Sequence, residues 1–248
     1  MTKQLHISVA PEVIGHLGPV SVNNSLLTSL VVLIILIVIA FMVKPNKKTS
    51  EKSKFTLLIE MVVEGFYGFF KNIAGDRTEK LFPILFTFFL FIILGNWIGL
   101  LPGVGSIGIY EAAEHGKKLI PIFRSPNADL NTTIALALIS VGITQYLSVK
   151  AHGLKGYIGK FVNIKNPINF FVGILEVISE FSKVLSFSFR LFGNIFAGEV
   201  LLVVMTFLIP LIIPVPFLIL EVFVGFIQAL VFTMLTTIFI VVATEKHH

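Results

Sequence analysis

One arginine lies in the middle of an almost wholly apolar stretch, residues 184–205, with the sequence VLSFSFRLFGNIFAGEVLLVVM. The guanidinium of Arg190 cannot lose its charge in a protein. A charged group at the centre of a bilayer costs between about 2.5 and more than about 10 kcal/mol, depending on the reference state. Arg190 is also too far from either end of the apolar stretch for its side chain to reach water fully. Arg190 must therefore face a partner group, a water-filled cavity or another subunit.

Helical geometry, at about 100° per residue, arranges the polar neighbours of Arg190 into one stripe. Asn194 lies about 40° from Arg190 on such a helix, one turn further on. The other members of the stripe are Ser186, Lys183 and Glu176. Glu199 falls about 180° away, on the opposite face.

A second apolar segment follows the prolines at 210–216 and carries Glu221 and Gln228, which are seven residues apart and share a helix face. An antiparallel hairpin would bring Glu221 to the depth of Glu199 and Gln228 nearer to Arg190. Two carboxylates would then meet on one side of the arginine, and Glu176 would mark a polar region on the other side.

Ionisable groups on both sides of a fixed cation indicate two half-channels that do not join. The cation would stop a proton or a sodium ion from leaking straight through, and it would favour the ionised form of an acidic carrier. Because no continuous relay of ionisable side chains crosses the whole bilayer, the carrier must come from a partner.

Each of these residues also has a purely structural interpretation. Arg190 could form an internal ion pair, and Gln228 could make a hydrogen bond between helices. Glu199 and Glu221 could form a pair at the outer interface. Three residues could be ordinary charges at the inner interface: Glu176, Glu180 and Lys183.

Composition defines the class of protein. Of the 248 residues, 55% are hydrophobic and only 13% are charged, whereas soluble domains carry about 25% charged residues. The absence of cysteine excludes thiolate ligands, and the histidines are scattered, so we expect no metal site and no cofactor. The net charge of +5 comes from lysines in short loops, which indicates membrane topology rather than nucleic-acid binding. We do not expect a cleaved signal peptide.

The sequence predicts an all-α polytopic membrane protein that forms a single membrane domain, residues 1–248. About 20 apolar residues cross the hydrocarbon region as a helix. The predicted membrane helices are residues 26–43, 81–101, 130–149, 167–209 and 217–243. An amphipathic helix, residues 55–71, is predicted to lie at the cytoplasmic surface, with its two glutamates on a solvated face.

The segment 167–209 is about twice as long as a bilayer crossing requires. It contains no proline after its first residue and no polar loop, and its glycines are isolated. We therefore predict one long tilted helix that forms a hairpin with the last helix. The motif GVGSIG, residues 103–108, has the residue spacing of the nucleotide-binding pattern G-x-G-x-x-G. Because no strand is predicted before it, we predict a turn rather than a nucleotide site.

Lysine-rich loops follow the first and third predicted spans, whereas the loop after the second span has balanced charges. The positive-inside rule makes the lysine-rich loops cytoplasmic. The N-terminus is then outside and the C-terminus is cytoplasmic.

The strings SFRLFGNIFAGEVLL and FIQALVFTMLTTIFI closely resemble the a-subunit of rotary F-type ATP synthases. NWIGLLPG and the segment from NPINFF onward fit the same family, and the resemblance extends from about residue 80 to the end of the chain. It implies a non-catalytic stator subunit, which passes protons or sodium ions to and from a rotating c-ring. The length and the lysine-rich loops favour a bacterial cell membrane over the alternative of a plastid one. The implied partners are the c-ring, the b-subunits of the peripheral stalk and membrane lipid, with no nucleic acid.

By this resemblance, Arg190 would be the stator arginine facing the ion-binding carboxylates of the c-ring, with Asn194 and Gln228 beside it. Glu199 and Glu221 would line the outer half-channel. Glu176 would lie towards the inner half-channel, and Ser186 lies close to the arginine stripe. The competing hypothesis is a self-contained secondary transporter or channel, which predicts a complete relay and preferably an internal repeat.

Overall fold

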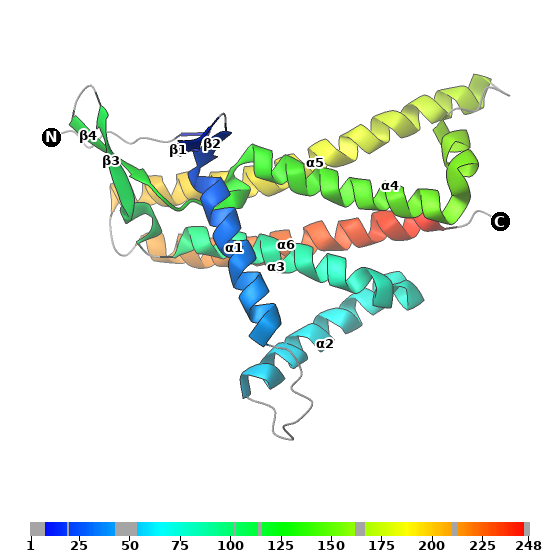
Figure 1. The fold of residues 1–248 in the computed structure, drawn as a ribbon, viewed down its shortest axis with the longest axis horizontal. Coiled ribbons are helices and arrows are strands. Elements are labelled where there is room, and N and C mark those ends of the chain that lie inside the picture. Colours follow the sequence, from blue (N-terminus) through cyan, green and yellow to red (C-terminus); the bar gives the residue numbers. More distant parts are fainter. Residues whose placement is uncertain are drawn as a thin grey trace.

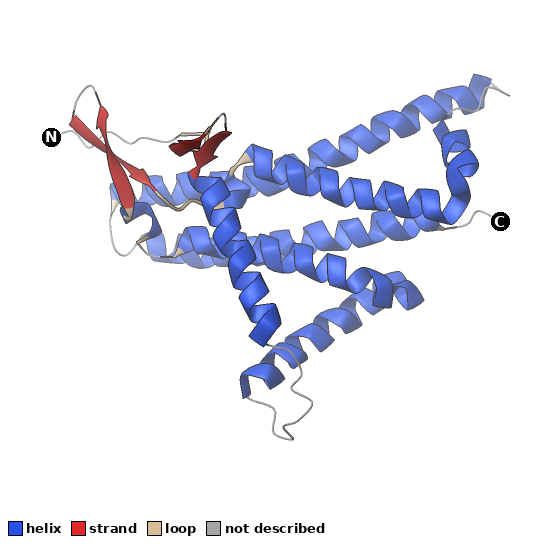
Figure 2. Ribbon diagram, in the orientation of Figure 1, coloured by secondary structure: helices blue, strands red, loops and turns tan. Residues whose placement is uncertain are grey.

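The computed structural model describes residues 8–18, 20–42, 54–101, 103–113, 116–161, 167–209 and 213–245. Within these ranges the chain is mainly helical and has two small antiparallel hairpins (Figure 2). The predicted fold class, an all-α polytopic membrane protein, is confirmed.

Six α-helices account for most of the described chain: α1 (Asn24–Met42), α2 (Lys54–Ala74), α3 (Thr78–Leu100), α4 (Leu130–Phe161), α5 (Pro167–Leu208) and α6 (Pro214–Thr244). Three short 3₁₀ turns connect or flank them: η1 (Gly75–Arg77), η2 (Val104–Ser106) and η3 (Pro126–Ala128). By length and apolar composition, the described residues contain five segments able to cross a membrane, with α2 and α3 forming one of them.

Helix α5 is continuous over 42 residues. At 1.5 Å per residue it is about 63 Å long, whereas the hydrocarbon core of a bilayer is about 30 Å thick. The prediction of one long helix followed by a returning helix is confirmed. Figure 1 shows α5 and α6 joined at one end of the molecule, which also carries both β hairpins and is called the hairpin end below. The other end, where the C-terminus lies, is called the C-terminal end.

Helix α4 continues beyond the predicted end at residue 149, through a segment that the sequence suggested was a lysine-rich loop. Gly153 has φ +72°, and the helix kinks there. Glycine adopts this left-handed conformation without a steric penalty. The kink folds the last part of α4 across the start of α5 (Figure 1).

The two hairpins were not predicted: no strand was expected before the first membrane helix or in the loop after the second. Strand β1 (Val13–Leu17) pairs with β2 (Val20–Asn23), and β3 (Gly108–Ala113) pairs with β4 (Gly116–Pro121). The GVGSIG motif is a turn, as predicted: Gly103 has φ +96°, η2 follows, and β3 begins at Gly108.

The hydrophobic core lies between α3, α4, α5 and α6. Its buried side chains are Phe88, Phe89, Ile92, Ile93, Ala128, Leu136, Ala137, Phe187, Leu191, Ile195, Ala229 and Phe232. Polar side chains at the hairpin end join the same helices, and Asn96 on α3 donates a 3.0 Å hydrogen bond to the carbonyl oxygen of Gly225 on α6.

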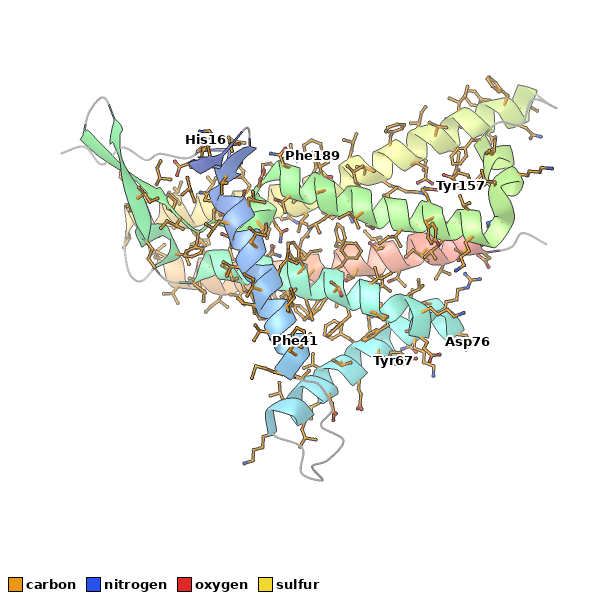
Figure 3. The ribbon with its side chains drawn as sticks, in the orientation of Figure 1. His16, Phe41, Tyr67, Asp76, Tyr157 and Phe189 are labelled. Atoms are coloured by element: carbon orange, nitrogen blue, oxygen red, sulfur yellow. The ribbon has the colours of Figure 1, made fainter. Side chains whose placement is uncertain are left out.

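Helix α2 folds back from α3 through η1 to form a V (Figure 1). Phe70 is 1% exposed and anchors a second apolar cluster with Leu81 and Leu85 of α3. The ring of Tyr67 meets that of Phe82 edge-on, with 5.2 Å between centroids (Figure 3). The predicted helix at 55–71 is present, and its place at a membrane surface remains a prediction.

The contact between α3 and α6 can be tested with a pair of introduced cysteines. The chain has no cysteine of its own, so no other thiol can react. A Cβ at Gly225 would lie 3.1 Å from the Cβ of Asn96, slightly less than the ~3.5–4.5 Å between the Cβ atoms of a disulfide, so a small shift of either helix brings the pair into range. We expect Asn96→Cys/Gly225→Cys to form a disulfide on mild oxidation. Counting free thiols by maleimide–polyethylene glycol gel shift should then give two thiols before oxidation and none after it.

The matched control is Asn96→Cys/Gly142→Cys, because a Cβ at Gly142 meets no atom within 4 Å. Both thiols should remain free in this control. Two free thiols in the test pair after oxidation would contradict the packing of α3 on α6.

Candidate functional site

Arg190 lies on the face of α5 that the rest of the described chain leaves open. Ser186, Gly193 and Asn194 on this face are exposed, whereas Leu191 on the other face is fully buried. The Nη2 atom of Arg190 donates a 3.2 Å hydrogen bond to the Oγ of Ser186. No carboxylate among the described residues pairs with the guanidinium. The cation therefore points away from the core of its own chain.

One turn further along α5, Asn194 connects this face to α6. Its Nδ2 donates a 2.9 Å hydrogen bond to the Oε1 of Gln228, which is 5% exposed. The hairpin therefore brings Gln228 close to the arginine stripe, but its partner is Asn194 rather than Arg190. The bond between helices that was one interpretation of Gln228 is present.

Glu199 and Glu221 come together across the hairpin, as the antiparallel arrangement predicts. The carboxylate of Glu221, which is 6% exposed, packs against the backbone of Gly198. Both glutamates line a small cavity of about 10 Å³, which has room for about one water molecule. Glycine at 198 is what lets the two carboxylates approach, because a Cβ there would overlap Glu221.

Glu199 forms an ion pair with Arg124, which was not predicted from the sequence. The Nε of Arg124, which precedes η3, lies 3.1 Å from the Oε2 of Glu199, and the side chains are 11% and 26% exposed. The backbone N–H of Arg124 donates a 3.2 Å hydrogen bond to the Oγ1 of Thr28 on α1. Arg124 was counted only as one charge in a balanced loop, although apolar residues surround it on its N-terminal side in LIPIFRSPN.

The segment after Arg124 inserts between the helices as a buried polar plug, defined here as Ser125–Asp129. Asn127 is fully buried and donates a 2.7 Å bond to Asn96 and a 3.2 Å bond to the carbonyl oxygen of Ile92. Asp129 accepts a 2.8 Å bond from Ser25 of α1. Side-chain polar groups thus replace water at this depth, as buried polar groups require.

Two glycines of α3 make room for the plug. A Cβ at Gly95 would lie 3.2 Å from the Nδ2 of Asn127, and one at Gly99 would lie 2.8 Å from the Cβ of Ser125. Small residues four apart permit this kind of close approach in membrane proteins. Between them, Trp97 donates a 3.1 Å bond to the carbonyl oxygen of Val222. Residues 95–99 of α3 therefore supply a docking surface for the plug.

A larger cavity of about 350 Å³ lies at the hairpin end and reaches Glu199. Its lining includes Ser8, Glu12, Arg124 and Phe196. The N-terminal segment, α3, the plug and α5 all contribute to its walls. This cavity and the smaller one share Gly99, Leu100, Ser125 and Glu199.

At the C-terminal end, the acidic residues of α5 pair with lysines. Glu176 lies 2.6 Å from the Nζ of Lys160, with side chains 28% and 43% exposed. Glu180 lies 2.7 Å from Lys183, whose ammonium is 5.0 Å from the centre of the Phe239 ring. Tyr157, in the arm of α4 beyond the kink (Figure 3), donates a 2.9 Å bond to Gln145. Across the described ranges, no group of three His, Asp or Glu side chains could hold a metal ion.

The family model for the ATP synthase A chain matches residues 26–241. The chain belongs to this family. A relative from Moorella thermoacetica, ATP synthase subunit a, is 31% identical over 239 residues, which cover 96% of this chain and 99% of the relative. The chain is thus a multi-pass membrane component of an F-type ATP synthase, non-catalytic, and forms the ion channel of the membrane sector. The alternative of a self-contained transporter is not favoured.

Gly198 gives a direct test of the two-carboxylate arrangement. We expect Gly198→Ala to displace the carboxylate of Glu221 and to lower ATP-driven ion pumping about tenfold, because one methyl group occupies the space that the carboxylate needs. Pumping is measured by dye quenching in membrane vesicles, per assembled complex.

The control is Gly142→Ala, since a methyl group at that position has open space. Its pumping rate should equal that of the unmodified complex. Equal rates for Gly198→Ala and the control would contradict the packing of Glu221 against α5.

Removal of the buried amide of the plug should destabilise the fold. Asn127→Ala leaves the Oδ1 of Asn96 without its donor, and an unsatisfied buried polar group costs about 1–3 kcal/mol. The free energy of unfolding, followed by denaturant titration in detergent, should fall by about this amount. Asn131→Ala, whose side chain is exposed, should change it little, and a similar fall in both variants would contradict the assignment.

Proposed function

We propose that Arg190 forms the barrier between two offset half-channels and faces the ion-carrying carboxylates of a rotating c-ring. The observation that carries this proposal is that Arg190 lies on an open helix face without an acidic partner in the described part of its own chain. A permanent cation in a low-dielectric region requires an anionic or aqueous partner. The family to which the chain belongs supplies that partner as a second subunit.

The outer half-channel runs from the 350 Å³ cavity to Glu199 and Glu221. Asn194 and Gln228 lie between this pair and the arginine, and their hydrogen bond keeps α5 and α6 in register. An ion that reaches Glu221 is then one short transfer from the open face of α5. The small cavity that both glutamates line supports this route.

The inner half-channel opens at the C-terminal end, with Ser186 beside Arg190 and Glu176 at the mouth. The ion pair between Glu176 and Lys160 is partly exposed, which suits a water-filled entrance. An ion released from the c-ring on this side cannot return to Glu221 because Arg190 repels it. Rotation of the c-ring is then the remaining way to connect the two half-channels.

The proposed partners are the c-ring, on the open face of α5, the b-subunits of the peripheral stalk, and membrane lipid. The proposed location is a bacterial cell membrane, with the N-terminus outside and the C-terminus in the cytoplasm. The lysine-rich segments 44–54 and 150–165 support this orientation. The hairpin end then faces outward, and the whole chain acts as one membrane domain.

Replacement of the cation tests the proposal. Arg190→Ala should lower ATP synthesis driven by an ion gradient by about 100-fold or more, because the barrier and the attraction for an ionised carboxylate disappear together. The quantity of assembled complex should stay close to that of the unmodified protein. Ser182→Ala, on the same helix, should retain synthesis, because its hydroxyl group bonds only the carbonyl oxygen of Ile178.

A second experiment measures ion flux into liposomes that contain the purified chain alone. We expect negligible ion flux under an imposed gradient, and flux only after c-ring is added. Robust flux without c-ring, or loss of assembly as the sole effect of Arg190→Ala, would contradict the proposed function.

A further inference from the structure

We propose that Arg124 is a positioning residue of the outer half-channel, which holds Glu199 in a fixed ion pair and leaves Glu221 as the carboxylate that takes up and releases the ion. This inference rests on the proposed function. It assigns different roles to Glu199 and Glu221, which their residue type alone does not distinguish.

Every nitrogen of the Arg124 guanidinium has a partner. The Nε donates to the Oε2 of Glu199, Nη1 to the carbonyl oxygen of Ala10, and Nη2 to the carbonyl oxygen of Ser8, each at 3.1 Å. The planar guanidinium fixes all three directions at once. Arg124 therefore ties the N-terminal segment, the plug and α5 together at the rim of the larger cavity.

This environment gives Glu199 a fixed charge balance. Protonation of its carboxylate would leave the nearly buried guanidinium of Arg124, 11% exposed, without a counter-charge. Removal of one partner from a buried ion pair is strongly unfavourable. A residue in such a pair suits the wall of a path better than the role of carrier.

Glu221 has the opposite environment. Its carboxylate is 6% exposed, and it makes no hydrogen bond or ion pair with any residue that the structure describes. The groups around it come from several elements: Asn96 and Gly99 of α3, Ser125 of the plug, and Glu199 and Ile195 of α5. Glu221 can therefore exchange a proton or bind a small cation without breaking an existing pair.

The two cavities give the order of transfer. An ion enters the cavity of about 350 Å³, in which Arg124 and Glu199 together present no net charge. It passes Glu199 into the cavity of about 10 Å³, where one water molecule would bridge it to Glu221. Because the charges of Arg124 and Glu199 cancel, neither residue of this pair repels or traps the ion; Glu12 is the other carboxylate of the lining.

A double-mutant cycle in the whole ATP synthase complex tests this division of roles. The variants are Arg124→Gln, Glu199→Gln, the two combined, and Glu221→Gln, and the readout is ATP-driven ion pumping per assembled complex. Each single change at 124 or 199 leaves one uncompensated charge in the entrance and should lower pumping about tenfold. The double variant should recover to about half of the unmodified rate, because positions 124 and 199 then leave no uncompensated charge.

Glu221→Gln should lower pumping about 100-fold, with or without Arg124→Gln. Arg124→Lys keeps the positive charge beside Glu199 and should pump within about threefold of the unmodified complex, which separates the ion pair from the ties to Ser8 and Ala10. Assembly is measured for every variant by the quantity of this chain that co-purifies with the c-ring.

Failure of Arg124→Gln/Glu199→Gln to exceed Glu199→Gln alone would overturn the inference, because it would make Glu199 itself a carrier. Pumping by Glu221→Gln at more than half of the unmodified rate would also overturn it. An Arg124→Lys rate as low as that of Arg124→Gln would exclude the ion pair as the cause. Failure of the proposed function would instead appear as flux through the unmodified chain without c-ring.

Discussion

The chain holds a guanidinium that cannot lose its charge on an open helix face within an apolar segment. Arg190 keeps its charge at the depth where charge is most costly, and the described part of its own chain gives it a serine hydroxyl rather than a carboxylate. Such a site is stable only beside a complementary partner. The other features of the fold either present this cation or control access to it.

Helix α5 presents the cation because its two faces differ. Phe187, Leu191 and Ile195 pack into the core with α3, α4 and α6, while the face with Arg190 stays open. The bond between Asn194 and Gln228 fixes the register of the hairpin, and the docking of the plug on Gly95 and Gly99 fixes the hairpin end. Because packed interiors are not continuously deformable, the open face is held rigidly.

Local sequence pattern was enough to predict the helices. Segment 167–209 contains no strong helix breaker after its first residue, and residues 167–208 form one helix, while the returning helix begins at Pro214. The proximity of Glu199 and Glu221 was also predicted from the sequence, because residues equally far from the turn of an antiparallel hairpin lie at the same depth. The continuation of α4 past 149 was missed because lysines suggested a loop, although only Gly153 departs from helical geometry.

Long-range polar contacts could not be predicted from one sequence. Arg124 is 75 positions before Glu199 in the chain, and the plug contacts α1 and α3 through side chains that no periodicity relates. The two β hairpins were missed for a similar reason, because the pairing of a strand depends on a second strand that the local sequence pattern does not identify. The roles proposed for Glu199 and Glu221 differ through these contacts, whereas their residue types are the same.

The accessibility of α5 to a thiol reagent shows whether the face that carries Arg190 meets the c-ring. Single cysteines at Gly193 and Asn194, on the face with Arg190, and at Leu191, on the core face, would be labelled with a maleimide in membranes with and without c-ring. We expect the first two positions to be labelled without c-ring and protected when it is present, while position 191 is unreactive in both. Equal labelling of 193 and 194 with and without c-ring would contradict the claim that this open face meets the rotor.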